Sequence, residues 1–288
     1  MKCWRTFSQK INNLFFVTPI DLSATEIDVI KEILLQLPKN QIIKCRQVCQ
    51  RWKKIIDERS FWLDKEKRDG ETYLRDLINS GNELFIKDYA FLSIKKPFNK
   101  NLLSPVNLNG YSDVQRHADP RWNFIGLGWR YASPPSFLDG HFHPDFQDLF
   151  SECQEVNTVY CEKYFHLNLL DHGISPEIVD TFRPPIIFSE YVAHEAETEC
   201  TYFCQIFLWD GVDRSKELYY ESKEIHFGVE QLQKWEKLEL VLKSYPPGVR
   251  AVYVYIQSSI EIGIFGCKIA GSNLEVKMEE SPPPVSKE

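Results

Sequence analysis

Residues 27–38 read Ile-Asp-Val-Ile-Lys-Glu-Ile-Leu-Leu-Gln-Leu-Pro, and they set the character of the N-terminal part of the chain. The apolar residues in this stretch recur at spacings of three and four, which predicts an amphipathic helix. They are Ile27, Ile30, Ile33, Leu34 and Leu37. Pro38 ends the helix, because proline has no amide donor and disfavours helical backbone in the residue before it.

Two further helices are expected at short intervals after Pro38. Asn40 is the predicted N-cap of the second, and Ser60 is the predicted cap of the third, which ends at Gly70. The second helix carries an apolar face made of Ile42, Cys45, Cys49, Trp52 and Ile56. Three short helices cannot enclose a large core, so we expect a partner to cover part of their apolar surface.

Beyond Pro97 the sequence pattern changes from helical to strand-like. Segments such as 201–209, 238–242 and 249–256 combine β-branched and aromatic residues with polar ones. Glycine and proline separate these segments at short intervals. Many strands at this spacing predict an antiparallel β-sandwich.

The N-terminal helical stretch resembles an F-box. The resemblance rests on Leu-Pro at 37–38, Cys-Arg-Gln-Val-Cys-Gln-Arg-Trp at 45–52 and Phe-Trp at 61–62. It implies docking onto the adaptor of an SCF-type cullin–RING ubiquitin ligase. The adaptor-binding residues that it implies are Ile33, Leu34, Leu37, Pro38, Ile42, Cys49, Trp52 and Trp62. Thr25-Glu26 stand where the family opens with Leu-Pro, which predicts weaker docking than is usual in this family.

Residues 84–276 resemble the F-box-associated (FBA) domain of the sugar-recognising F-box proteins. The matching strings are Asn-Leu-Leu-Ser-Pro at 101–105, Pro-Ile-Ile-Phe-Ser-Glu-Tyr at 185–191, Tyr-Pro-Pro-Gly-Val-Arg at 245–250 and Gly-Ile-Phe-Gly-Cys-Lys at 263–268. The implied fold class is α+β multidomain, a small all-α F-box followed by an antiparallel β-sandwich of the galactose-binding-like jelly-roll type. The expected boundaries are 1–20 for an N-terminal arm, 21–70 for the F-box, 71–96 for a helical linker, 97–278 for the substrate-binding sandwich and 279–288 for a disordered tail.

The predicted target-binding surface is one end of the sandwich. The family's glycan binders present a Tyr-Trp pair just before the last turn, whereas this chain has Ile260 and Glu261 there, followed by Ile262. Tyr160 is the aromatic residue of the neighbouring loop. Because sugars stack on aromatic faces, the missing pair favours a protein target. We predict that these four residues bind the target; in the alternative, both isoleucines pack inward and Glu261 is solvated.

No metal and no cofactor is predicted. His141 and His143 lie in the most metal-like string, but the flanking Gly140 and Pro144 favour a polar loop. Cys200 and Cys204 share a strand face without a second pair of ligands, which favours core positions over a zinc site. The eight cysteines form no compact framework, so we expect them to be reduced and buried.

Charge and hydropathy indicate which classes of partner and which cellular compartment to expect. The net charge of −7, with no long basic run, argues against binding driven by nucleic-acid phosphates. The apolar stretch 14–17 is too short for a leader or a membrane-spanning helix. We therefore expect a cytoplasmic protein, with the nucleus as an alternative, and neither nucleic-acid binding nor membrane insertion.

These observations lead to one main functional hypothesis. The chain is predicted to be the non-catalytic substrate-recognition subunit of an SCF-type cullin–RING E3 ubiquitin ligase, recruiting a target protein for ubiquitination and degradation. Its expected partners are the adaptor, the cullin scaffold and a target, glycosylated or not. The alternatives are an N-glycan-binding receptor in ER-associated degradation, an interaction protein without ligase docking, and a metal-dependent enzyme built around His141 and His143.

Overall fold

The computed structural model describes residues 27–79, 89–103, 122–125, 129–132, 153–194, 199–211, 217–228, 235–260 and 266–278. The chain divides into two compact units, Met1–Asp76 and Leu77–Glu288. We call them the helical unit and the strand unit and describe each by itself.

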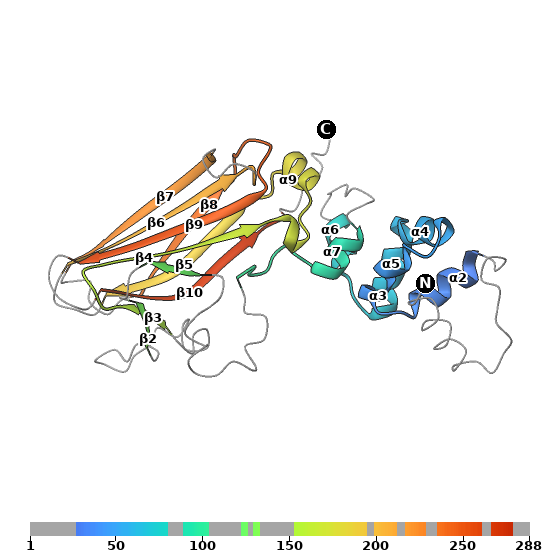
Figure 1. Ribbon diagram of the computed structural model, residues 1–288, viewed down its shortest axis with the longest axis horizontal. Helices are drawn as coiled ribbons and strands as arrows, with labels where there is room; N and C mark the ends of the chain where they lie inside the picture. The colour runs from blue at the N-terminus through green and yellow to red at the C-terminus, as the bar shows by residue number, and fades with distance from the viewer. Residues whose placement is uncertain are drawn as a thin grey trace, which may run out of the picture. The chain divides into compact units, whose positions relative to one another are not determined.

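The helical unit contains short helices joined by short connections (Figure 1). They are α2 (Ile27–Leu35), α3 (Lys39–Cys45), α4 (Gln50–Ile56) and α5 (Arg59–Asp69), and α6 (Tyr73–Asn79) begins at the end of this unit. The apolar stripe of the first stretch correctly predicted α2. The prediction of one continuous second helix was wrong. The chain forms two helices there, α3 and α4, and Cys49, in extended backbone (φ −159°, ψ 167°), is the N-cap of α4.

The ends of the helices differ in part from the predicted caps. The predicted caps at Asn40 and Ser60 were wrong, because α3 begins at Lys39 directly after Pro38 and α5 begins at Arg59 after Glu58. Gly70 does end α5 with a left-handed backbone (φ 73°), as predicted. Only glycine adopts this conformation without a steric penalty, so the signal at the C-terminus was the more specific one.

The strand unit is a sandwich of two five-stranded antiparallel sheets, as expected (Figure 1). One sheet has the order β1-β4-β9-β6-β7 and the other has the order β2-β3-β10-β5-β8. The strands are β1 (Asn123–Ile125), β2 (Trp129–Ala132), β3 (Cys153–Val156), β4 (Tyr160–Asn168), β5 (Ile186–His194), β6 (Cys200–Trp209), β7 (Glu217–Phe227), β8 (Glu236–Leu242), β9 (Ala251–Ile260) and β10 (Cys267–Val276). Helix α7 (Tyr89–Lys95) precedes them, and the 3-10 turn η2 (Leu170–His172) and α9 (Pro176–Phe182) lie between β4 and β5.

The core of the strand unit lies between the two sheets. Every second residue of β6 is buried, from Cys200 through Leu208, and β9 alternates in the same way. Phe165 of β4 and Phe188 of β5 meet across the sandwich with ring centroids 6.3 Å apart. Strands with one buried face require alternation of this kind, so the pattern fixes which residues of each strand face the core.

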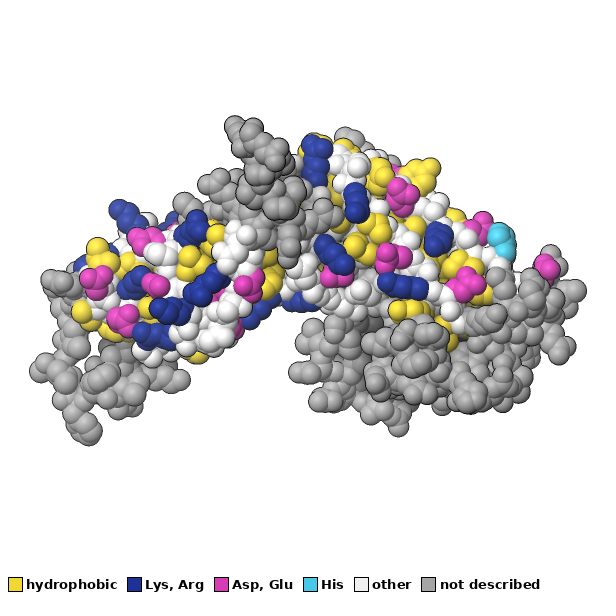
Figure 2. Space-filling view, turned by 180° about the vertical axis from the view of Figure 1, so that it is seen from behind, with side chains coloured by type: hydrophobic (Ala, Val, Ile, Leu, Met, Phe, Trp, Pro, Cys, Tyr) yellow, Lys and Arg dark blue, Asp and Glu magenta, His cyan; other side chains and the backbone are white. Residues whose placement is uncertain are grey.

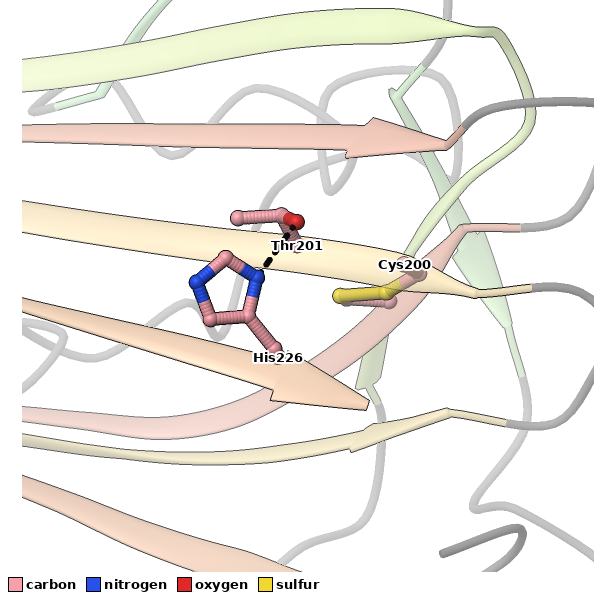
Figure 3. The surroundings of a disulfide bond; sticks show 4 residues. Cys200, Thr201 and His226 are labelled. Atoms are coloured by element: carbon pink, nitrogen blue, oxygen red, sulfur yellow. Dashed lines mark hydrogen bonds between the residues drawn. A yellow bond between two sulfur atoms is a disulfide. The ribbon is translucent and has the colours of Figure 1, made fainter. Parts of the chain in front are cut away.

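A disulfide between Cys200 and Cys267 joins β6 of one sheet to β10 of the other (Figure 3). Beside it, Thr201 Oγ1 and His226 Nδ1 form a hydrogen bond of 3.1 Å. The expectation that all cysteines are reduced was therefore wrong for this pair, because sequence spacing does not show which strands face each other across a sandwich. In the described part of the chain, the cysteines outside this disulfide are Cys45, Cys49, Cys153, Cys161 and Cys204, and Cys49 is the exposed one.

Asn101 joins the segment after α7 to strand β10 by hydrogen bonds. Its side-chain oxygen accepts hydrogen bonds from the amides of Leu103 (2.8 Å) and Leu274 (3.2 Å), and its Nδ2 donates to the carbonyl of Ser272 (3.0 Å). One side chain thus satisfies backbone groups of two segments that are far apart in the sequence.

Asp180 and Arg250 join α9 to the connection before β9. Arg250 donates to Asp180 Oδ1 (2.9 Å) and Oδ2 (2.7 Å), and the amide of Gly248 donates to Oδ1 (2.7 Å). The hydrogen bonds from Arg250 lower the pKa of Asp180 below its ordinary value. A carboxyl group whose pKa is lowered by folding stabilises the protein above its unfolded pKa, and this contribution is lost as the pH falls through the lower, folded pKa.

Asp180→Asn should therefore lower the free energy of unfolding by about 1 kcal/mol at neutral pH, because the pair is partly exposed. Its effect should shrink below about pH 4, where the aspartate of the unfolded chain is protonated. Urea denaturation at several pH values measures this, with Asp171→Asn at an exposed position as the control. Equal losses for Asp180→Asn at neutral and acid pH would contradict the assignment.

Candidate functional site

Four of the predicted adaptor-binding residues form the interior of the helical unit. Leu34 and Ile42 are 0% exposed, Trp52 is 4% exposed and Trp62 is 1% exposed. Trp62 also donates from Nε1 to the carbonyl of Ile56 (2.7 Å). Direct contact of these four with an adaptor stays a prediction, but their packing means that they would act on docking by holding the shape of the unit.

The other predicted residues are more accessible. Ile33 and Leu37 are half-buried, whereas Pro38 and Cys49 are exposed. The structure adds three exposed apolar residues that the sequence did not single out as binding residues: Ile27 (55% exposed), Val29 (50%) and Val48 (37%). Exposed apolar side chains occur at the start of α2 and in the connection before α4, so these are the places where a partner can remove apolar surface from water.

Ion pairs hold α2 against α5. Lys31 Nζ lies 2.6 Å from Asp64 Oδ2, and Arg68 Nη2 lies 2.5 Å from Glu32 Oε2. Each surface pair contributes at most about 1 kcal/mol, so their main effect is to fix which side of α2 stays exposed. Figure 2 shows Lys and Arg side chains lying among hydrophobic ones on the helical unit.

Tyr160 is presented at the predicted target-binding end of the sandwich. It is the first residue of β4 and is 49% exposed. Its hydroxyl donates a hydrogen bond to Glu162 and lies 3.4 Å from the hydroxyl of Tyr255. The hydrogen bond to Glu162 raises the pKa of Tyr160, because ionisation would place a second negative charge beside the carboxylate. Tyr160 is thus a neutral aromatic group with an accessible ring.

Ile260 does not share this exposure. It is the last residue of β9, is 4% exposed, and its amide donates to the carbonyl of Val159 (3.0 Å). Its side chain packs inward, as in the alternative stated for it from the sequence. Glu261 and Ile262 lie outside the described residues. Of the four predicted target-binding residues, the structure therefore places two at the same end of the sandwich and presents one of them, Tyr160.

A buried polar network lies between the two sheets of the sandwich. Lys163 of β4 and Glu190 of β5 are each fully buried and form an ion pair of 2.9 Å. Lys163 also donates to Gln154 (2.9 Å), while the hydroxyls of Tyr202 and Ser272 donate to the carboxylate of Glu190. The ammonium lies 4.3 Å from the ring centroid of Trp122 and 5.4 Å from that of Trp129. Buried charges need such complete pairing, so this network fixes the two sheets relative to each other.

The structure offers few groups for metal or cofactor chemistry where it is described. His141 and His143 lie outside the described residues, and within those residues no three His, Cys, Asp or Glu side chains gather as a metal site would require. Burial raises the pKa of the Cys204 thiol well above its ordinary value, which suits a core residue rather than a ligand. In the same residues, no helix has the length and hydropathy to cross a membrane.

Comparison with protein-family models matches the F-box domain over residues 27–64 and the F-box associated region over residues 93–276. The chain belongs to the F-box proteins that carry an F-box associated region. In this F-box protein the first match runs from α2 into α5, and the second runs from α7 to the end of β10. An F-box implies an adaptor and a cullin scaffold as partners, together with a substrate.

Curated relatives match the sequence of this F-box protein over most of their length. F-box only protein 6 of Mus musculus is 24% identical over 263 residues, which cover 89% of this chain and 84% of that protein. F-box only protein 2 of Bos taurus is 24% identical over 225 residues, which cover 76% of this chain and 71% of that protein. Both relatives are named as F-box only proteins, in agreement with the family of this chain.

Solved structures similar to the strand unit of the F-box protein include carbohydrate-binding modules. The module TmCBM61, solved in complex with beta-1,4-galactotriose, has a TM-score of 0.37 and 9% identity, covering 54% of this chain and 88% of that one. The CBM22-2 xylan-binding domain from Paenibacillus barcinonensis Xyn10C has a TM-score of 0.36 and 9% identity, covering 58% of this chain and 98% of that one.

Proposed function

We propose that this F-box protein is the substrate-recognition subunit of an SCF-type cullin–RING ubiquitin ligase. In this role the helical unit docks onto the adaptor, and the strand unit holds a target protein for ubiquitination and degradation. The chain supplies no bond chemistry in this proposal. It supplies proximity, because holding the target in the complex raises the effective concentration of its lysines at the conjugating enzyme.

The observation that carries the proposal is the exposed apolar surface of the F-box. Val29 and Ile27 lie on α2 with about half of their surface in water, next to a core that is already filled by Leu34 and Trp62. The helical unit cannot bury these side chains by repacking, since its interior positions are occupied. We propose that a docking partner covers them.

Val29→Glu should weaken the complex with the adaptor about tenfold or more, because it places a charge in a contact that must be apolar. Binding is measured by calorimetry with the purified adaptor. Val159→Glu is the matched control, since Val159 is 54% exposed and lies in the strand unit. Unchanged affinity for Val29→Glu would contradict this use of α2.

The target is proposed to bind at the end of the sandwich that presents Tyr160. A protein surface is the first candidate, because Ile260 occupies a position where the family's glycan binders carry an aromatic residue, and its side chain is buried. An N-glycan, as in ER-associated degradation, is the second candidate, and the exposed ring of Tyr160 favours it. The proposal places the protein where the adaptor and cullin work, in the cytoplasm or nucleus.

A further inference from the structure

The outer face of sheet β1-β4-β9-β6-β7 carries a dense group of aromatic side chains. In β6 the even-numbered residues face the core, and the odd-numbered ones are half-buried on the opposite face. The register places the outward residues of β4, β7 and β9 beside them. We call this group the aromatic face; it consists of Tyr164, Phe203, Phe207, Trp209, Tyr220, Tyr253 and Tyr255.

Tyr253 lies at the centre of this group. Its ring stacks on Trp209, with centroids 5.0 Å apart and an angle of 16° between the planes. Phe207 and Tyr164 lie 5.8 Å and 5.4 Å from the same ring. Tyr220, which is 54% exposed, extends the group onto the edge strand β7 and lies 6.3 Å from Phe207. The contacts form one continuous surface across four strands rather than scattered exposed rings.

Glutamates are the Asp, Glu, Lys or Arg residues found at the described outward positions of this face. Glu224 and Glu162 stand in the same cross-strand row, separated by Phe203 and Gln257. Three steps between neighbouring strands put the backbones of these two glutamates about 14 Å apart. Glu217 lies beside Trp209. At the outward positions of β1, β4, β9, β6 and β7 that the structure describes, these glutamates have no Lys or Arg beside them.

The other sheet is different. There Lys237 pairs with Glu239 (2.6 Å), and Lys277 lies 3.9 Å from Glu275, so charges of both signs neutralise each other. On the aromatic face Glu224 lies 3.6 Å from His226 Nε2, and the described outward positions of its strands carry no Lys or Arg. Aromatic rings attract cations through their negative faces, and carboxylates do so directly. The face is therefore complementary in charge to a basic ligand.

We infer that the aromatic face binds a segment of a partner protein that presents Lys or Arg beside apolar side chains. The cations would lie over the rings and near Glu224 and Glu162, and the apolar side chains would cover Phe207 and Tyr253. The inference deepens the proposed function and depends on it only in calling this partner the ubiquitination target. It adds a second recognition surface, which meets the end that presents Tyr160 where the hydroxyls of Tyr160 and Tyr255 lie 3.4 Å apart.

The test uses the full chain and a fluorescent synthetic peptide of alternating Arg and Leu, with the corresponding Glu and Leu peptide as the charge-reversed probe. Anisotropy should show binding of the first peptide and none of the second. Tyr220→Ala combined with Glu224→Gln should weaken binding about tenfold. The matched control combines Tyr219→Ala, on the opposite side of the same strand, with Glu239→Gln on the other sheet, and should change affinity less than about twofold.

Four outcomes would overturn the inference. Equal losses in the two double variants would show attraction by net charge alone. Equal binding of both peptides would show contact without charge recognition. Binding of a chitobiose-core oligosaccharide that Tyr220→Ala abolishes would make the face a glycan site. Adaptor affinity is measured in the same samples, so failure of the peptide with intact adaptor binding contradicts this inference, whereas lost adaptor binding contradicts the proposed function.

Discussion

Lys163→Met should lower the free energy of unfolding by about 3–5 kcal/mol, the cost of leaving one partner of a buried ion pair uncompensated. Lys163 and Glu190 are both 0% exposed, so water cannot replace the lost ammonium. The hydroxyls of Tyr202 and Ser272 would remain as donors to Glu190, but they are neutral. Urea denaturation followed by near-ultraviolet circular dichroism measures the loss.

Two comparisons separate charge from packing in this prediction. Lys237→Met removes a lysine from an exposed pair with Glu239 and should cost less than about 1 kcal/mol. Adding Glu190→Gln to Lys163→Met removes the unpaired charge and should restore much of the stability. If the double variant is as unstable as Lys163→Met alone, the loss comes from the cavity near Trp122 instead.

Trp62→Ala should lower the stability of the helical unit by about 3–5 kcal/mol and abolish adaptor binding. The side chain is 1% exposed, donates to Ile56 and meets Phe61 edge-on at 5.5 Å. A unit of this size has little stability in reserve, so it should unfold while the strand unit stays folded. Hydrogen exchange of residues 27–69 and of β4 to β6 measures the two units separately.

The comparison with Val29→Glu decides how Trp62 contributes to docking. Val29→Glu should keep α2 to α5 protected from exchange and still weaken binding, since Val29 is 50% exposed. Trp62→Ala should remove the protection first. If Trp62→Ala leaves the helices protected and weakens only the complex, Trp62 contacts the adaptor directly, as the resemblance to the F-box implied.

Local sequence patterns predicted the helices and strands of this fold better than they predicted which side chains are buried within it. The stripe of α2 and the glycine that ends α5 are properties of a few consecutive residues, and both predictions were confirmed. The fate of Trp52 and Trp62 depends on whether neighbouring helices or a partner covers them. An apolar stripe reads the same in both cases, so the sequence identified these residues but not their burial.

The aromatic face was missed for a related reason. In residues 201–209 the inward residues Tyr202 and Ile206 alternate with the outward residues Phe203 and Phe207, so both faces of the strand are apolar. The pattern then predicts a strand without showing which of its faces is exposed to solvent. The disulfide and the order of strands depend on contacts between distant segments, which no local pattern encodes.

The position of Cys200 has a consequence for how this protein can change its specificity. Ile260 lies opposite Cys200 in the register of β6 and β9, and Cys267 is bonded to the same residue. Both ends of the connection between β9 and β10 are therefore held beside Cys200, whatever residues the connection contains. Loops with fixed ends tolerate substitution and insertion at small cost. We expect this connection to accept foreign sequences, by evolutionary drift or by grafting, while both sheets keep their places.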